Sequence, residues 1–309
     1  MGRIFGLKRF EIHDGDGIRT TLFLKGCPLR CRWCHNPEGL SAAPQTAWLE
    51  ERCLHCGRCA AVCPAHVMED GRHRMRFDAC RGCGTCAGVC PARALTFYGE
   101  EVSVGEILPR LLEDRLFFDA SGGGVTLSGG EPMLQAEFAA AVLEALKREG
   151  IHTALDTCGF APWTAYEKVL PWTDLVLFDV KAASEQTHLA CTGQSNRQIL
   201  ENLWRIDALG KVLDVRVPFV PGLNDHEMEA VADLLTPLRS LRHVKILPYH
   251  DYASAKYRSL WLPVPLEEVV PPDDEAVRRV VLCFRRRGLD AAGPSGDPPE
   301  DGKGTVRRP

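Results

Sequence analysis

The chain has 309 residues and a formal charge of −4, from 37 basic and 41 acidic residues. This balance does not indicate a nucleic-acid or membrane surface, and the length suffices for one barrel-sized domain with an insert or for two ordinary domains. No apolar run approaches the length of a membrane span, and the first residues lack the apolar stretch of a signal peptide.

Fourteen cysteines are many for an intracellular protein of this size. Secreted disulfide scaffolds are usually much shorter and carry a signal peptide. We therefore interpret most of the cysteines as thiolate ligands in a reducing compartment, and we expect a cytoplasmic protein without nucleic-acid or membrane partners. Three cysteines lie outside any cysteine motif and are interpreted as small buried apolar residues, namely Cys158, Cys191 and Cys283.

A loop with three cysteines follows the first predicted strand, over 20–25, which comes after a glycine-rich turn. Cys27, Cys31 and Cys34 have C-x3-C-x2-C spacing, so one short loop could ligate three irons of a 4Fe–4S cluster. An electron-transfer cluster takes four cysteines, and the missing one indicates that something else binds the fourth iron. Zinc is the alternative, but it would need another Cys or His at paired spacing, and His35 is adjacent to Cys34.

An internal repeat occupies the segment 45–98. Residues 53–65 recur as residues 80–92, and each copy has the C-x2-C-x2-C-x3-C-P run of bacterial two-cluster ferredoxins, in which the fourth cysteine ligates the other cluster. Zinc is again the alternative, and two complete runs argue against it. The repeat predicts a ferredoxin-like insert in which one cluster takes Cys53, Cys56, Cys59 and Cys90 and the other takes Cys80, Cys83, Cys86 and Cys63.

From residue 99 onward, predicted strands and helices alternate. Ser103 and Glu106 form a capping box at the start of a helix, and apolar residues at helical spacing predict further helices up to a last one over 273–287. Such alternation implies a parallel sheet with right-handed crossovers. The tail from Gly288 has almost nothing to bury, so we expect it to be disordered. The later strands are predicted over 124–127, 153–155, 175–178, 213–217 and 244–247.

Polar residues that the apolar pattern does not explain follow the C-terminal ends of these strands, where barrel-like α/β folds build their active sites. After the second strand, Gly129-Gly130-Glu131 offers a backbone cradle for a ligand's ammonium group, although Gly-Gly is also common in turns. His250, after the last strand, is as consistent with a structural histidine as with a site residue. Trp33, in the cysteine loop, could simply pack, or it could stack on adenine.

Charged residues follow the third, fourth and fifth strands. Asp156 and Asp179 could each be a lone acid at the edge of the sheet, but together they could hold a cation beside a ligand carboxylate. Lys181 and Arg216 would supply positive charge for that carboxylate, with bidentate geometry available to the arginine.

Together these residues resemble the glycyl-radical-enzyme activating enzymes of the radical S-adenosylmethionine (SAM) superfamily, in the branch with a ferredoxin-like insert. The resemblance runs from about Ile12 to His250. Position 16 is Asp where the family usually has Pro, in a loop that the family brings near the glycine-containing peptide. The matching motifs are Asp14-Gly15 with 17–20, 26–38 except position 32, the two ferredoxin runs, 124–132 except position 127, Asp156-Thr157 with Gly159, 178–181, Arg216 and 247–250.

The resemblance implies an α/β fold, a partial (β/α)6 radical SAM barrel with an inserted ferredoxin-like domain that holds two 4Fe–4S clusters. Residues 1–44 would begin the barrel, 45–98 would form the insert, 99–287 would complete the barrel, and 288–309 would be the tail. Asp156, Thr157 and Asp179 match the family's site for a monovalent cation. The residues that match its SAM contacts are Trp33, Cys34, His35, Gly130, Asp179, Val180, Lys181 and His250.

The activity implied by the resemblance is one-electron cleavage of SAM to a 5′-deoxyadenosyl radical, which takes hydrogen from a glycine of a partner glycyl radical enzyme. Three 4Fe–4S clusters and SAM are the implied cofactors. The implied partners are that enzyme and a flavodoxin or ferredoxin electron donor, and we expect a monomer. The alternatives are a radical SAM enzyme that modifies a small molecule or a peptide, and an electron-transfer ferredoxin with a barrel attached.

Overall fold

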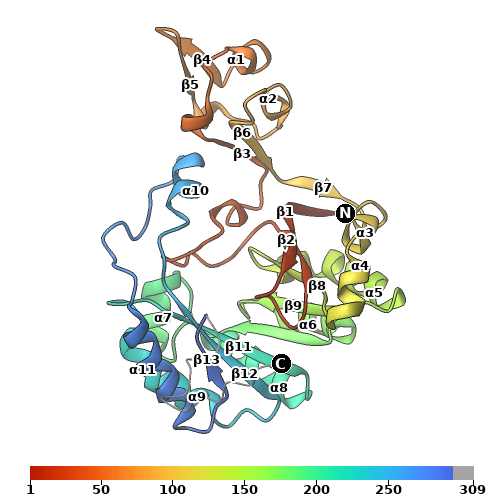
Figure 1. The fold of residues 1–309 in the computed structure, drawn as a ribbon, viewed down its shortest axis with the longest axis vertical. Helices are drawn as coiled ribbons and strands as arrows, with labels where there is room; N and C mark the ends of the chain where they lie inside the picture. The colour runs from red at the N-terminus through yellow and green to blue at the C-terminus, as the bar shows by residue number, and fades with distance from the viewer. Residues whose placement is uncertain (295–309) are drawn as a thin grey trace, which may run out of the picture.

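A curved sheet of nine strands forms the centre of the protein, whose computed structural model describes residues 1–294 (Figure 1). Its strands are β1 (Gly2–Glu11), β2 (Arg19–Leu24), β7 (Glu100–Val102), β8 (Gly124–Gly129), β9 (His152–Thr157), β10 (Leu175–Asp179), β11 (Val212–Phe219), β12 (Leu241–Pro248) and β13 (Ala291–Ala292). They lie in the order β13-β12-β11-β10-β9-β8-β2-β1-β7.

The six predicted strands are confirmed as the middle of this sheet. β2, β8, β9, β10, β11 and β12 are neighbours in chain order, and all their pairings are parallel. Strands such as β8 and β10 are almost fully buried, as expected for a parallel sheet that is covered on both faces. The C-terminal ends of these strands therefore meet at one edge of the sheet.

The predicted glycine-rich turn is present before β2, but the strand that precedes it was not predicted. β1 pairs antiparallel with β2, and β7 pairs antiparallel with β1, so the sheet continues beyond the parallel strands. The strand was hard to recognise because irregularities at Ile4/Gly6 and Lys8/Glu11 break its alternation. The glycine-rich turn connects the two strands and lies between Glu11 and Arg19.

Helices cover the sheet and connect its parallel strands. The capping box is confirmed, since Glu106 N donates to Ser103 Oγ at 3.2 Å and Ser103 N donates to Glu106 Oε2 at 2.8 Å. The helices are α3 (Val104–Leu112), α4 (Arg115–Ser121), α5 (Ala136–Arg148), α6 (Trp163–Val169), α7 (Glu185–Thr192), α8 (Arg197–Ala208), α9 (Met228–Leu235), α10 (Ser254–Ser259) and α11 (Asp274–Arg285). Short 3-10 turns are η1 (Pro37–Gly39), η4 (Pro132–Gln135), η5 (Leu170–Trp172) and η6 (Asp225–Glu227).

The end of the chain departs from the prediction of disorder from Gly288. Residues 291 and 292 form β13, which pairs in parallel with β12, and Val244 N donates to Asp290 O at 2.8 Å. The prediction was therefore wrong for 288–294, and the rest of the predicted tail, 295–309, lies outside the described residues. No helix within residues 1–294 is long and apolar enough to cross a membrane.

The segment 45–98 lies at one end of the molecule, apart from the large sheet (orange in Figure 1). It has its own small core, with Trp48, Met75 and Leu95 packed among cysteines. Its first and last strands pair with each other, so the chain enters and leaves this segment at one place. Its elements are β3 (Gln45–Trp48), η2 (Glu50–Arg52), α1 (Arg58–Val62), β4 (His66–Glu69), β5 (Arg72–Met75), η3 (Phe77–Ala79), α2 (Thr85–Gly88) and β6 (Leu95–Tyr98).

The loop between β1 and β2 reaches across the inside of the curved sheet. Asp16 accepts from both terminal nitrogens of Arg242 on β12, at 2.5 and 3.1 Å, and Arg242 also pairs with Asp214 on β11. This contact joins the N-terminal loop to β11 and β12, which lie five and six places from β1 in the sheet order. The contact holds the β1–β2 loop against β11 and β12 across the curved sheet, so Asp16 has a structural role.

Candidate functional site

The cysteine loop leaves the C-terminal end of β2 and is fixed by backbone hydrogen bonds. Cys27 N donates to Leu40 O at 3.2 Å, which closes the loop on itself. Arg30 N donates to Thr192 O at 2.7 Å and Arg32 N donates to Cys191 O at 3.0 Å, so the C-terminal end of α7 holds the middle of the loop. The position of the cysteines is thus set by main-chain contacts on two sides.

The glycine pair at the end of β8 packs directly on this loop. Gly130 N donates to Leu24 O at 2.8 Å, and a Cβ on Gly130 would lie 2.1 Å from Gly26 O and 2.5 Å from Gly39 O. Gly129 has a φ of +127°, which side chains rarely adopt. Close backbone packing therefore explains both glycines, and their use as a cradle for an ammonium group stays a prediction.

The three cysteines of the loop form an all-sulfur donor set. Burial raises the pKa of Cys31 to about 12 and that of Cys34 to about 11, and the nearby sulfurs add to both effects. The Lys181 ammonium acts in the opposite direction on both thiols. Thiolates close to one another and to a single lysine fit an iron–sulfur cluster, because the metal stabilises the deprotonated form that burial alone disfavours.

A fourth thiol lies beside this set. Cys158 is buried at the end of β9, and its hydrogen bond to Cys27 lowers the pKa of Cys27. Cys191 is likewise buried, whereas Cys283 is half-buried. The interpretation as buried apolar residues is therefore confirmed for Cys191 and incomplete for Cys158, which contacts the loop. It holds in part for Cys283, which packs against the core but is half-buried, with its sulfur 3.1 Å from Arg287 Nη1.

Four of the predicted SAM contacts line one pocket. The rings of His35 and His250 stack with centroids 3.8 Å apart, and His35 Nε2 lies 3.3 Å from His250 O. Burial lowers the pKa of His35 to about 4, so the ring is neutral and suits a flat, uncharged partner. The Nδ1 atom of His250 is buried without a hydrogen-bond partner. The pocket is lined by Trp33, Cys34, His35 and His250 together with residues such as Tyr249, Tyr257 and Leu266.

Arg216 lies at the centre of the predicted charged residues. Its Nε donates to Asp179 Oδ1 at 3.1 Å, one terminal nitrogen pairs with Asp156, and the other lies 3.5 Å from Asp14 Oδ1. Asp179 and Arg216 are direct partners in the parallel pairing of β10 and β11, which explains their proximity. The arginine is thus engaged with three carboxylates, and its use as a bidentate ligand for a carboxylate stays a prediction.

Lys181 joins this network to the cysteines. Its Nζ donates to Asp179 Oδ2 at 2.8 Å, and its side chain is 7% exposed. Burial opposes both charges, but Asp179 and the thiols raise the pKa of Lys181 above its usual value. Lys181 and Arg216 in turn hold the pKa of Asp179 below its usual value, although burial acts against them. The lysine and Asp179 are therefore a buried ion pair.

The carboxylate of Asp156, by contrast, takes up a proton more readily than that of Asp179. Burial raises its pKa to about 6 against the effect of Arg216, and Ser128 Oγ donates to its Oδ2 at 2.5 Å. Thr157 Oγ1 donates to Glu131 Oε1 at 2.9 Å and lies 2.8 Å from Tyr166 OH. Of the residues predicted to hold a monovalent cation, Asp156 and Asp179 contact Arg216 and Thr157 contacts Glu131 and Tyr166, so we derive no step from such a cation.

Glu131 and Val180 have structural contacts. The Glu131 carboxylate is fully buried and accepts from Cys158 N at 2.7 Å, Thr157 Oγ1 and Met133 N at 3.0 Å, so it joins the ends of β8 and β9. Burial nevertheless raises its pKa to about 6. Val180 is also buried, and its N donates to Arg216 O at 2.9 Å. Both residues help to position the strand ends that carry the site.

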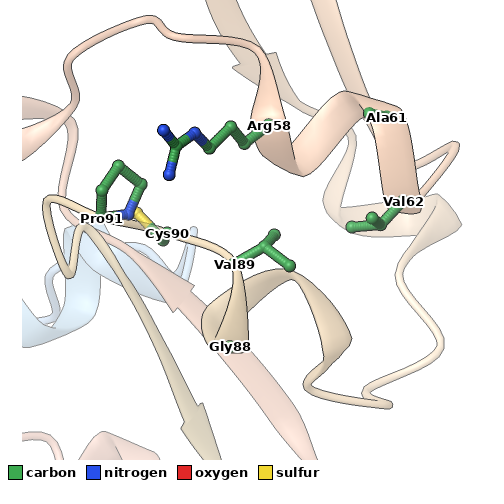
Figure 2. Close-up of a pocket in the computed structure, with 7 residues that line it drawn as sticks. All are labelled: Arg58, Ala61, Val62, Gly88, Val89, Cys90 and Pro91. Atoms are coloured by element: carbon green, nitrogen blue, oxygen red, sulfur yellow. The ribbon is translucent and has the colours of Figure 1, made fainter.

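The cysteines of the segment 45–98 lie close together in the first predicted set and, for three of the four residues, in the second. Cys53, Cys56, Cys59 and Cys90 line one small pocket. In the second set, the charges of Cys63 and Cys80 both act on Cys86, whose pKa is raised mainly by burial. The pocket of the first set reaches the surface near Cys90, where a shallow groove runs between α1 and α2 past Arg58, Val62, Val89 and Pro91 (Figure 2).

Sequence reasoning missed three neighbours of the site. Asp14 lies in the glycine-rich turn, which hid its contact with Arg216. Lys256 of α10 donates to His35 O at 2.9 Å and pairs with Glu38 at 2.7 Å, so a helix 220 residues away in the chain clamps the cysteine loop. Tyr257 is buried next to Cys34. No local motif marks α10, and only its place in the fold reveals it.

Comparison with known proteins identifies the family. Residues 21–235 match the radical SAM superfamily. The chain is 41% identical to the trans-4-hydroxy-L-proline dehydratase activating enzyme of Clostridioides difficile, over 91% of this chain and 95% of that protein. It is 40% identical to the choline trimethylamine-lyase activating enzyme of Oleidesulfovibrio alaskensis, over 92% of this chain and 94% of that protein.

A solved structure supports the fold. A radical SAM methyltransferase from Sphaerobacter thermophilus superposes with a TM-score of 0.54 at 15% identity, over 94% of this chain and 76% of that one, which bears on the fold alone. The family match and the two relatives, together with the three-cysteine loop at the end of β2, decide the assignment. The chain belongs to the radical SAM superfamily and, within it, to the glycyl-radical-enzyme activating enzymes.

Proposed function

We propose that this protein cleaves SAM by one-electron reduction and removes a hydrogen atom from a glycine of a partner glycyl radical enzyme. The observation that carries the proposal is the identity of about 40% to activating enzymes over nine-tenths of the chain. When bound, a 4Fe–4S cluster supplies the electron and SAM supplies the radical that takes the hydrogen. The partner belongs to the lyases, dehydratases and decarboxylases of the pyruvate formate-lyase type.

The chain's own residues would bind and orient these groups. Cys27, Cys31 and Cys34 would hold the first cluster, because the loop itself offers three thiols, while the neighbouring Cys158 thiol comes from another strand end and hydrogen-bonds to Cys27. The neutral, stacked rings of His35 and His250, with Trp33 in the same pocket, suit adenine. The Lys181–Asp179 pair would face the polar end of SAM, because the charge of Lys181 acts on both Cys31 and Cys34.

The network around Arg216 would keep this arrangement in place. It balances three carboxylates at neighbouring strand ends with one guanidinium, so Asp179 stays ionised beside Lys181. α10 would hold the cysteine loop from the other side through Lys256. Because main-chain and side-chain contacts hold the loop in place, it would exclude water from the radical. The reaction needs no general base and no protein nucleophile.

We further propose that residues 45–98 form a ferredoxin-like insert with two more 4Fe–4S clusters, between barrel residues 1–44 and 99–287. The shared pocket of Cys53, Cys56, Cys59 and Cys90 supports the first set, and the interactions of Cys86 with Cys63 and Cys80 support the second. Cys56 and Cys83 are exposed, so an electron donor such as flavodoxin or ferredoxin could approach both clusters. The protein would act as a monomer in the cytoplasm.

Isotope transfer tests the proposed reaction. The partner enzyme, labelled with deuterium at glycine Cα, is incubated anaerobically with this protein, SAM and a reductant. We expect deuterium in 5′-deoxyadenosine and a glycyl radical signal by electron paramagnetic resonance (EPR). Cys31→Ala should give neither, and Cys283→Ala, far from the loop, is the matched control. Deuterium that arrives only from a small metabolite would instead support the small-molecule alternative.

Iron analysis tests the three-cluster assignment. The ligand count predicts about twelve irons per chain after anaerobic reconstitution. An iron content near four, with zinc in the segment 45–98, would contradict the proposed insert clusters while leaving the first cluster intact.

A further inference from the structure

A buried histidine pair lies beside the first cysteine set of the segment 45–98, and the proposed function does not use it. His66 of β4 and His73 of β5 are 3% and 2% exposed. His66 Nδ1 lies 2.8 Å from His73 Nε2, and His73 Nδ1 lies 3.6 Å from Cys53 Sγ. The three side chains thus form one line of polar contacts that ends at a predicted cluster ligand.

Metal ligation of Cys53 would fix the direction of these hydrogen bonds. A metal-bound thiolate can only accept, so His73 Nδ1 must carry the hydrogen that faces Cys53. His73 Nε2 is then an acceptor and takes the hydrogen of His66 Nδ1. The line ends at His66 Nε2, which is buried and has no partner in the described structure.

The surrounding residues hold the His73 ring in this orientation. The Trp48 ring packs edge-on against it, with centroids 4.7 Å apart. The backbone N of His73 donates to His55 Nδ1 at 3.0 Å. A ring that is fixed by packing and by hydrogen bonds at both nitrogens is typical of a residue that tunes a metal site from outside its ligand set.

The two halves of the repeat differ at this point. In both runs a backbone N–H lies 3.4 Å from the first cysteine, from His55 to Cys53 and from Gly82 to Cys80. Within residues 1–294, Cys53 receives the additional imidazole and Cys80 has no side-chain donor of this kind. The first cysteines of the two runs therefore supply an internal comparison, because their backbone contacts are alike and Cys53 has an imidazole that Cys80 does not have.

We propose that His73 is a positioning residue for electron entry: its Nδ1–H bonds to the Cys53 sulfur and raises the reduction potential of the cluster held by Cys53, Cys56, Cys59 and Cys90. The proposal rests on the proposed function, since it assumes that these cysteines hold a cluster. A hydrogen bond to a ligand sulfur stabilises the reduced, more negative cluster. This cluster would therefore take the electron more readily from an external donor than it would without His73.

An EPR-monitored redox titration of the full-length, reconstituted protein tests this. In His73→Phe we expect the midpoint potential of one insert cluster to fall by about 59 mV. For a one-electron couple, this means a ratio of reduced to oxidised cluster about tenfold lower at a fixed solution potential. The other two clusters should keep their midpoints. A purely structural role for His73 would alter iron content but would not move one midpoint selectively.

Three further variants sharpen the test. His73→Asn places an amide nitrogen near the position of Nδ1 and should restore most of the wild-type midpoint. His66→Phe keeps the donor but removes its partner, so its shift should be smaller than that of His73→Phe. Thr85→Val removes a hydroxyl 3.4 Å from Cys83 Sγ, so it should shift the other insert cluster and leave this one unchanged.

The outcomes separate this inference from the proposed function. Twelve irons in His73→Phe with all midpoints unchanged would overturn the inference and leave the clusters standing. Should His73→Phe fail to bind iron, a midpoint for His73→Asn below that of His66→Phe would overturn it instead. Wild-type zinc at Cys59, His66 and His73, whose donor atoms all lie within 4.8 Å of one another, would overturn both the inference and the insert clusters.

Discussion

At the scale of single residues, Arg216 decides the stability of the site. Its side chain is 14% exposed and faces Asp14, Asp156 and Asp179. Arg216→Met would remove the guanidinium that faces all three acids, and removal of one partner from a buried ion pair costs about 3–5 kcal/mol. We expect that loss in anaerobic guanidinium unfolding.

The matched control is Arg242→Met, which also removes an arginine that joins two aspartates. Its side chain is 33% exposed and pairs with Asp16 and Asp214. Because water screens such pairs, we expect a loss of about 1 kcal/mol. Equal losses in the two variants would show that the Arg216 network carries no special stability.

Gly130 makes a second prediction at this scale. In Gly130→Ala the new Cβ would meet two backbone oxygens of the cysteine loop, neither of which can rotate away. We expect a destabilisation of about 3 kcal/mol and a loss of iron from the loop, measured by unfolding and by iron analysis.

Gly105→Ala is its control, because Gly105 lies in α3 with nothing within 4 Å of a new Cβ. Alanine should stabilise that helix by about 0.5–1 kcal/mol. A Gly130→Ala variant with full iron and wild-type stability would contradict the packing described here.

The residue types of the site were predictable from the sequence, but their pairing was not. Asp156, Asp179, Lys181 and Arg216 stand out because each lies at or near the C-terminal end of a predicted strand. Their mutual neutralisation depends on the register that places Asp179 directly beside Arg216 on the next strand. That register is a property of the sheet, so a linear pattern could only suggest that the arginine was free for a ligand.

At the scale of elements, α10 and Trp261, two residues beyond its end, connect the two parts of the molecule. Trp261 stacks on Phe77 of the segment 45–98, with ring centroids 5.4 Å apart and planes at 11°. Its φ of +58° is unusual for a bulky residue, so the stack holds a strained backbone in place. Lys256 of the same helix clamps the cysteine loop.

Trp261→Ala should loosen this connection. The loss of the aromatic stack costs about 0.5–1.5 kcal/mol, and hydrogen exchange should speed up in the segment 45–98 while α5 stays protected. Trp261→Gly should be more stable than Trp261→Ala by about 1–2 kcal/mol, because glycine adopts positive φ without strain. The reverse order of the two variants would show that the strain is absent.

Element prediction from the sequence succeeded where one physical signal dominated. Strands such as β8 and β10 were found because both of their faces are buried, which leaves continuous apolar runs. β1 was missed because its alternation is broken, and β13 was missed because two residues in a polar tail give no pattern. Both strands exist through pairing with a neighbour that the sequence does not identify.

At the scale of the whole molecule, buried neutral histidines make stability depend on pH. His188 is 1% exposed, and its Nδ1 donates to Gln194 O at 2.7 Å. Burial lowers its pKa, so below an unfolded pKa of about 6.5 the unfolded chain takes up a proton that the folded chain refuses. This destabilises the fold as pH falls, by up to about 1.4 kcal/mol between about pH 7.5 and 5.5.

His188→Asn isolates this effect, because its amide can replace the Nδ1 donor and does not titrate. The wild type should lose about 1 kcal/mol more than the variant on acidification, as measured by the midpoint of guanidinium unfolding at the two pH values. Parallel losses in both proteins would mean that His188 accepts a proton in the fold.

The pairing of β3 with β6 has a consequence for the history of the chain. The two crossings into the segment 45–98 touch, since a Cβ on Gly99 would lie 2.7 Å from Pro44 Cα. A short bridge between these points would bypass the segment without moving a strand of the large sheet. Such a cassette can be gained or lost in one genetic event that leaves the cysteine loop and the strands of the large sheet unaltered.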